Sequence, residues 1–175
     1  MADTILKSPG AIAIHGGGVL AVEIVTADGQ TPTLPWVDIG TIATFSHKDD
    51  TTVKKEPDET GNIAAVNLDV RDVIETGTIM ESNATLINFL KDSTRDVFFR
   101  AYKYLGIVNG KKQEAWFPLC KFVPKIDLTS GTKRIPFEIH FLPVSAATTF
   151  ATAPASAYAA PPVIAAGSYY ALTET

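Results

Sequence analysis

Short runs of residues that could perform chemistry occur in this sequence, but each lacks a part that the chemistry requires. The run His15-Gly16-Gly17-Gly18 matches the tetrad that forms the oxyanion hole of some esterases. That reaction also needs a serine nucleophile in a G-x-S-x-G turn, and the sequence contains none. The run is therefore interpreted as a flexible glycine hinge between an N-terminal arm and the first strand.

A second glycine-containing run, residues 106–112 (GIVNGKK), has a faint likeness to a phosphate-binding loop. The spacing between its glycines is one residue short, and no Ser or Thr follows the lysine. The pair Asn109-Gly110 inside the run is instead a strong β-hairpin signal, because both residues tolerate the positive φ of a type I′ turn. The run is therefore predicted to be a turn.

The potential metal ligands are scattered along the chain. His15, His47 and His140 fall in separate segments, and no pair has the spacing H-x-x-x-H or H-x-H of a metal site. The carboxylates at residues 49–50 and 58–59 could bind calcium, but three lysines among them would oppose a cation. No metal site is therefore expected.

Cys120 is the only cysteine, so the chain has no intrachain disulfide and no multi-cysteine metal site. Its neighbours Phe117, Leu119, Phe122 and Val123 predict a buried, inert thiol. Together these observations predict no catalytic residue, no cofactor and no bound metal. The chain is therefore expected not to be an enzyme.

The overall composition fits one globular domain flanked by arms. Hydrophobic residues make up 46% of the 175 residues, and the length is too short for two ordinary domains. The formal net charge of −4 provides no basic surface for nucleic acid, and no apolar run approaches the roughly 18 residues of a membrane helix. The predicted organisation is an N-terminal arm (1–18), a β domain (19–144) and an Ala/Pro-rich C-terminal arm (145–175).

Period-two patterns and turn residues predict a mainly β domain. The expected strands span residues 19–25, 40–45, 62–80, 97–108, 113–126 and 133–142. Residues 97–108 also fit a helical stripe, but their aromatic and β-branched content and the following Asn109-Gly110 favour a strand. A two-residue turn there would place Phe99 opposite Cys120. Two prolines suggest that the partner strand is an edge or bent strand.

The strand expected over residues 62–80 alternates between apolar and polar side chains. Its even positions are mostly apolar and are expected to face a core, whereas its odd positions are expected to face water. A short helix should follow, capped by Ser82 or Asn83, with an apolar stripe that includes Leu86 and Leu90.

Two further segments differ from the predicted strands in composition. Residues 47–61 are rich in charge and contain one aliphatic side chain, Val53, so they are interpreted as a long solvated loop or a loop that orders against a neighbour. No charged residue occurs between Ser145 and Thr173. Because tyrosines and aliphatic residues lie there, an extended arm that docks on another subunit and a disordered tail are both open.

Over residues 36–91 the order of features resembles the tail tube proteins of long-tailed bacteriophages. The likeness depends on Asp38-Ile39-Gly40 at a strand start, a charged loop ending at Gly61, a long alternating strand, and the helix lead-in Thr78-Ile79-Met80-Glu81-Ser82-Asn83. It implies a β-sandwich or small β-barrel with one flanking short α-helix. Six copies would form a hexameric ring with a continuous inner β-barrel, and rings would stack into a tube.

The resemblance also implies a function and partners. The chain would be a structural subunit of the virion tail, assembled in the host cytoplasm, that polymerises with itself and conducts DNA during ejection without binding it specifically. Other partners would be the tape measure protein, the tail terminator and baseplate or tip proteins, with no membrane involved. The alternatives are another virion or secretion-tube component (tail terminator, head decoration or type VI-like tube protein) and a β-sandwich binding module or small enzyme.

Two sets of residues acquire roles under this hypothesis. The side chains expected to face the lumen and keep DNA from adhering are Asn67, Asp69, Arg71 and Glu75. The residues expected to contact the adjacent ring are Asp49, Asp50, Lys54, Lys55, Glu56, Asp58 and Glu59. Mixed charge suits the wall of a water-filled channel, and a long charged segment suits contacts that order on assembly.

Overall fold

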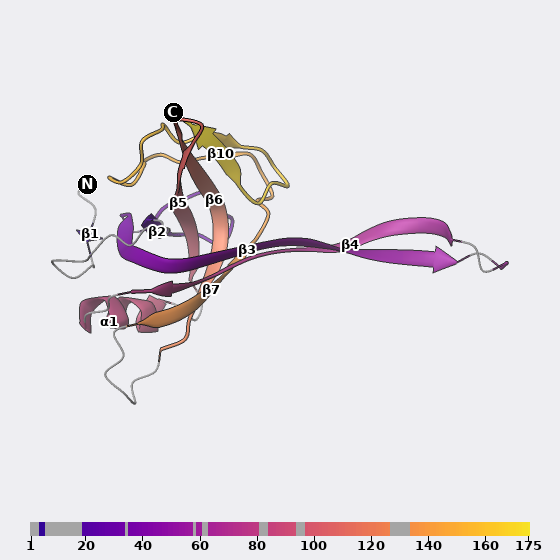
Figure 1. Ribbon diagram of the computed structural model, residues 1–175, viewed down its shortest axis with the longest axis horizontal. Coiled ribbons are helices and arrows are strands. Elements are labelled where there is room, and N and C mark those ends of the chain that lie inside the picture. The colour runs from indigo at the N-terminus through magenta and orange to yellow at the C-terminus, as the bar shows by residue number, and fades with distance from the viewer. Residues whose placement is uncertain are drawn as a thin grey trace.

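The structure is a computed structural model that describes residues 4–5, 19–33, 35–57, 59–60, 63–80, 84–93, 97–126 and 134–175. Across these residues the fold is mainly β with one α-helix (Figure 1), so the predicted fold class is confirmed at that level. The elements are β1 (Thr4–Ile5), β2 (Val19–Val25), β3 (Val37–Pro57), β4 (Ile63–Ile79), α1 (Ala84–Ser93), β5 (Phe98–Val108), β6 (Lys111–Pro124), β7 (Ile135–Phe141), β8 (Thr148–Thr149), β9 (Val163–Ile164) and β10 (Ala171–Glu174).

Among the described residues, eight strands form a curled sheet. Six of them follow one another in the order β3-β2-β5-β6-β7-β4, and β4 pairs again with β3. Neighbours along this path are antiparallel, whereas the short β1 lies parallel to the start of β3. Figure 1 shows the sheet curving through the body, with α1 near its lower end. The curl gives the sheet an inner face and an outer face. The buried apolar side chains form two separate clusters.

The inner face holds the larger apolar cluster, here called the inner core. Its buried members come from all six strands and from α1, and they include Leu20, Ile39, Val73, Leu86, Phe99, Phe122 and Ile139. Burial alternates along β7 as the sequence predicts, with Ile135, Phe137, Ile139 and Phe141 buried. Leu86 and Leu90 attach α1 to this core, which confirms the predicted amphipathic helix.

The outer face of β5 and β6 is covered by the C-terminal segment, residues 142–175. The outer core there includes Trp36, Tyr102, Trp116, Phe150 and Ile164. Trp36 Nε1 donates a hydrogen bond to Thr152 O at 3.1 Å, and β10 pairs with β6 alongside Trp116. The segment that was expected to be a docking arm or a disordered tail therefore packs on its own chain, where its apolar residues help to bury two tryptophans.

β5 and β6 form the hairpin that the sequence predicts. Asn109 and Gly110 make its turn with φ angles of 53° and 80°, and Phe99 lies opposite Cys120. The strand interpretation of residues 97–108 is confirmed over β5, and the helical alternative is wrong. Side chains of β5 reach both the inner and the outer core, which explains why apolar residues occur on both of its faces.

β6 is not an edge strand, although its prolines suggested an edge or a bend. It pairs with β5 on one side and with β10 and then β7 on the other. Pro118 falls between the last β10 pair, at Trp116, and the first β7 pair, at Cys120, and beside a register shift in the β5 pairing. A residue without an N–H is tolerated there because the ladder is already interrupted.

β3 and β4 continue past the body as a long hairpin (Figure 1). β4 pairs with β7 only from Val73 to Ile79, but its pairing with β3 continues to Ile63 opposite Pro57. The interpretation of residues 47–61 as a loop is therefore wrong as far as Pro57. Pairing of the main chain with β4, and not burial of side chains, provides the order that this charged segment could not obtain alone.

Candidate functional site

The hairpin of β3 and β4 is exposed to solvent along the part of β3 that extends past the body. We define the arm as residues 50–57 of β3 and residues 63–72 of β4, which among the described residues pair only with each other. Every side chain from residue 50 to residue 57 is exposed, and at roughly 3.3 Å per residue this stretch is about 26 Å long. A two-stranded ribbon is marginally stable alone, and its outer edges can pair with another chain.

Charges of both signs lie along the β3 strand near and within the arm. Lys48 Nζ is 3.2 Å from Asp50 Oδ2, and Lys54 Nζ is 3.7 Å from Glu56 Oε1. All four side chains are at least half exposed, so each pair contributes little to stability. Because the signs balance, this surface suits contact with a protein of mixed charge better than contact with nucleic acid, which requires clustered Lys and Arg.

A buried ion pair lies where the hairpin joins the body. Lys103 Nζ of β5 donates to Glu75 Oε1 of β4 at 2.8 Å, and His47 Nδ1 of β3 lies 3.1 Å from the same oxygen. The side chains of Glu75 and Lys103 are only 3% and 8% exposed. This cluster therefore links both strands of the hairpin to β5.

The expectation that Glu75 faces water is wrong. Val73, Glu75 and Ile79 are all buried, so the odd positions of β4 face inward within the body. The sequence carries part of this change, because from Val66 to Val70 the apolar residues lie at even positions, whereas the buried Val73 and Ile79 lie at odd positions. A buried carboxylate requires a partner, and Lys103 supplies one.

A second ion pair joins the two strands of the hairpin directly. Arg71 Nε and Nη2 donate to Asp49 Oδ1 and Oδ2 at 2.8 and 2.6 Å. These hydrogen bonds lower the pKa of Asp49 and raise the pKa of Arg71. Two residues of the C-terminal segment, Tyr169 and Tyr170, contact the same pair. The hairpin is thus attached to the body by side chains from β5 and from the C-terminal segment.

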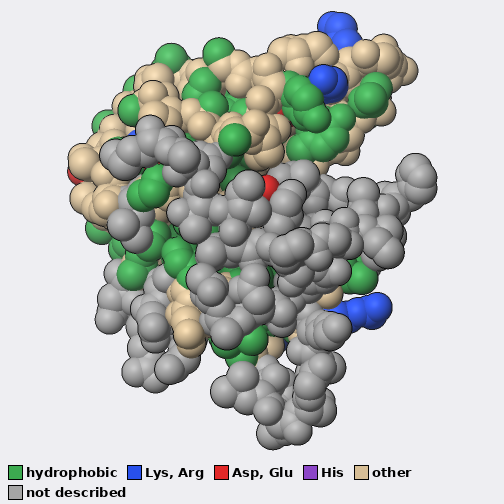
Figure 2. All heavy atoms as spheres, turned by 90° about the vertical axis from the view of Figure 1, so that its left-hand side faces the viewer, with side chains coloured by type: hydrophobic (Ala, Val, Ile, Leu, Met, Phe, Trp, Pro, Cys, Tyr) green, Lys and Arg blue, Asp and Glu red, His purple; other side chains and the backbone are tan. Residues whose placement is uncertain are grey.

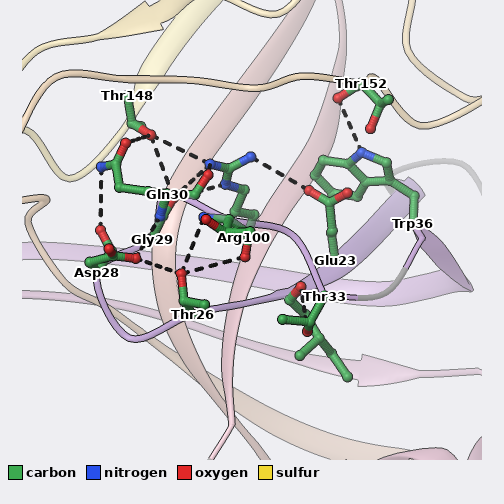
Figure 3. Close-up of polar contacts among 12 residues, drawn as sticks. Glu23, Thr26, Asp28, Gly29, Gln30, Thr33, Trp36, Arg100, Thr148 and Thr152 are labelled. Atoms are coloured by element: carbon green, nitrogen blue, oxygen red, sulfur yellow. Dashed lines mark hydrogen bonds and ion pairs between the residues drawn. The ribbon is translucent and has the colours of Figure 1, made fainter.

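Arg100 is a second buried cation, and its contacts are structural (Figure 3). Its guanidinium donates to Gly29 O at 3.1 and 2.6 Å and to Gln30 O at 3.0 Å, and its Nη1 lies 3.7 Å from Glu23 Oε2. Burial lowers the pKa of Arg100, and the charge of Glu23 opposes that shift. Because these contacts join a fully buried guanidinium to Gly29 and Gln30, Arg100 holds the turn between β2 and β3 against β5.

The remaining candidates for chemistry that the structure describes do not assemble into a site. Within the described parts of the chain, no group of three His, Cys, Asp or Glu residues could hold a metal ion. His140 lies 3.6 Å from Glu138 on its own strand, whereas His47 contacts Glu75. Residues 106–112 form the β5–β6 turn and its flanks.

Cys120 confirms the prediction of a buried thiol. Its Sγ donates to Phe99 O at 3.3 Å, and burial raises its pKa well above the usual value. A thiol that is neither exposed nor ionised is a poor nucleophile.

Several predicted features lie outside the described residues. They are the hinge at residues 15–18, the helix caps at residues 82–83, Asp58, and the N-terminal arm apart from β1. The side chains of Asn67 and Asp69 also lie outside the description, although their backbone belongs to β4. Arg71 is exposed, as its assigned role requires.

The structure brings together the two sets of residues to which the tail tube hypothesis gives roles. The ring-contact set lies largely on the β3 strand of the hairpin, and the lumen set lies on the β4 strand paired with it. Asp49 and Arg71, one from each set, form the ion pair between the strands. The sequence analysis did not identify Lys103, Tyr169 or Tyr170 as contacts of the hairpin. For the two tyrosines the sequence offered one signal, their occurrence side by side in an uncharged segment.

Apolar side chains also reach the surface away from the arm. Figure 2 shows them in the upper part of the body, where the C-terminal segment lies in Figure 1. The large exposed apolar residues of β5, β10 and the C-terminal segment are Leu105, Ile107, Val108, Tyr158, Val163 and Leu172. Such residues can add to an interface but do not identify its partner.

No protein-family model matches the chain, and a search of curated proteins finds no match. Among the described residues, no helix is long and apolar enough to cross a membrane. Function is therefore inferred from the geometry of the exposed arm and from its attachment to the body.

Proposed function

We propose that the chain is a structural subunit of a phage tail tube, whose copies form hexameric rings that stack into a conduit for DNA ejection. The observation that carries this proposal is the arm, a two-stranded ribbon that extends from a curled antiparallel sheet. Its exposed backbone edges and balanced charges are suited to ordered contact with other protein copies.

In a self-assembled tube, every arm would have another copy of the same chain as its partner. A ribbon of this length that stays in water gains little from burial, whereas docking on a neighbouring ring would cover its edges and side chains. The exposed lysines Lys54 and Lys55 would limit random edge pairing before assembly. The ring-contact residues of this proposal are Asp49, Asp50, Lys54, Lys55, Glu56, Asp58 and Glu59.

The proposed lining of the lumen is smaller than the sequence suggested. Asn67, Asp69 and Arg71 keep this role in the proposal, and Glu75 is excluded because its carboxylate is buried against Lys103. The lining would contain both signs of charge, so DNA phosphates would not adhere strongly.

A shortened arm tests the proposed role in stacking. Residues 52–70 are replaced by Asn-Gly, so that the directly paired Thr51 and Arg71 flank a two-residue hairpin turn. The unmodified protein is expected to form long hollow tubes in negative-stain micrographs, whereas the shortened variant forms rings or short stacks. Val163→Ser, at a position that is 70% exposed and off the arm, is the matched control and should form long tubes.

Protection of the Cys120 thiol from labelling shows whether the shortened variant has kept its fold. Long, regular tubes from a folded shortened variant would rule out the stacking role of the arm.

A reversal of charge tests the lumen role: virions carrying Asp69→Lys should eject DNA more slowly than unmodified virions. Ejection at the unmodified rate would show that this charge has no such role.

A further inference from the structure

The C-terminal segment contacts the hairpin through two consecutive tyrosines, one for each strand. Tyr169 Oη donates to the backbone carbonyl of Arg71 on β4 at 3.3 Å. Tyr170 Oη donates to Asp49 Oδ2 on β3 at 3.4 Å. The two hydroxyl groups therefore contact the two residues whose side chains form the ion pair across the hairpin.

The aromatic rings make a second set of contacts at the same place. The guanidinium carbon of Arg71 lies 4.9 Å from the centre of the Tyr169 ring, within the range of a cation–π contact. The Tyr170 ring meets the His47 ring edge-on at 5.9 Å and lies 5.8 Å from the Phe117 ring, which belongs to the inner core. Tyr170 thus bridges the hairpin and the core.

The two tyrosines are held from both sides along the chain. Before them, Gly167 N donates to Val144 O at 2.8 Å, and Val144 N donates to Ser168 O at 3.3 Å. Gly167 has a φ of 79°, which a glycine adopts without strain. After them, Ala171 starts the pairing of β10 with β6. The dipeptide is therefore a short bridge between two points fixed on the body.

The position of this bridge matters because the hairpin has a narrow attachment. Pairing of β4 with β7 ends at Val73, and among the described residues the strands beyond it pair only with each other. At an arm length of about 26 Å, a rotation of about 10° at the base moves the tip by roughly 5 Å. Contacts at the base therefore determine where the tip points.

We infer that Tyr169 and Tyr170 form a clamp through which the C-terminal segment sets the direction of the arm. The clamp fixes the base by holding one residue of each strand, and its release frees the arm to swing without unfolding the body. Its consequence for assembly rests on the proposed function, because identical copies can dock their arms in register only if the arms point the same way.

Hydrogen exchange and spin labelling on the full-length monomer test the clamp. In Tyr169→Ala/Tyr170→Ala, the amides of residues 46–51 and 71–73 are expected to exchange at least about ten-fold faster, since two hydrogen bonds and two ring contacts with the hairpin are lost. Spin labels at Lys55→Cys on the arm and Val123→Cys on the body should give a narrow distance distribution that broadens in the alanine variant. The native Cys120 is buried and does not compete for the label.

Two control variants separate the clamp from general damage to the segment. Leu172→Ala changes a side chain that is 61% exposed in the same segment, and it should leave exchange and distances unchanged. Tyr169→Phe/Tyr170→Phe removes the hydroxyl groups but keeps the rings, so it should give intermediate exchange. Unchanged exchange and an unchanged narrow distribution in a folded alanine variant would overturn the inference. These readouts need no polymer, so they stay decisive if the unmodified protein forms no tubes.

Discussion

The ion pair between Glu75 and Lys103 provides a sharp test of how the hairpin is fixed to the body. The change is Glu75→Gln, which keeps the size of the side chain and removes its charge. Lys103 would then keep a buried ammonium group without the carboxylate 2.8 Å away. His47 would lose the same charged partner.

The expected loss follows from the distance and the burial. At 2.8 Å the gross attraction is about 6 kcal/mol for an effective dielectric constant of about 20. Desolvation offsets part of that attraction in the intact pair, but removal of one partner leaves the other charge buried, which typically costs roughly 3–5 kcal/mol. We therefore expect Glu75→Gln to lower the free energy of unfolding by about 3 kcal/mol or more.

Urea denaturation followed by tryptophan fluorescence measures this loss, because Trp36 and Trp116 are both buried. The double variant Glu75→Gln/Lys103→Met completes a thermodynamic cycle and should recover part of the stability, because no charge of this pair remains buried. The exposed pair Lys54 and Glu56 is the matched control, and Glu56→Gln should change stability by less than about 0.5 kcal/mol. A loss below about 1 kcal/mol for Glu75→Gln would show that this ion pair does not fix the hairpin to the body.

Three further predictions concern the other buried or paired groups. Arg100→Met should lower the free energy of unfolding by roughly 3–5 kcal/mol in urea denaturation, because the carbonyl groups of Gly29 and Gln30, in the turn between β2 and β3, lose their charged donor. A loss below about 1 kcal/mol would contradict this. Cys120 should resist a thiol reagent at pH 8 in the folded protein and react fully in denaturant, because burial raises its pKa; rapid reaction in the fold would show that the site is accessible. The pKa of Asp49 is lowered from its usual 3.8, so its bond to Arg71 stabilises the fold above that pH and is lost as pH falls below it through the folded pKa. Carbon-13 NMR titration of the Asp49 carboxyl should therefore give a midpoint below 3.8, and a midpoint at or above 3.8 would contradict the ion pair.

Much of the body could be predicted from local patterns. β2 has the expected bounds, and the Asn109-Gly110 turn fixed both the hairpin and the pairing of Phe99 with Cys120. That pairing held because two register shifts within the hairpin offset each other, which no count along the chain could reveal. β7 was equally clear because every second side chain along it is buried in the inner core.

The hairpin was missed because its order comes from a partner strand and not from its own apolar residues. Residues 50–57 carry the composition of a loop, and only their pairing with β4 makes them a strand. The inward position of Glu75 was missed for a related reason: a polar residue was taken to face water, although Lys103 is available on a strand that is distant in sequence. Contacts between distant segments, including those of Tyr169 and Tyr170, leave little trace in a single sequence.

The central claim is that copies of this chain assemble into a hollow tube through their arms. Negative-stain electron microscopy of the purified, unmodified protein over a range of concentrations tests it most directly. We expect six-fold rings with an open centre that stack into uniform rods as concentration rises. Solitary compact particles at every concentration, with no rings or rods, would contradict it.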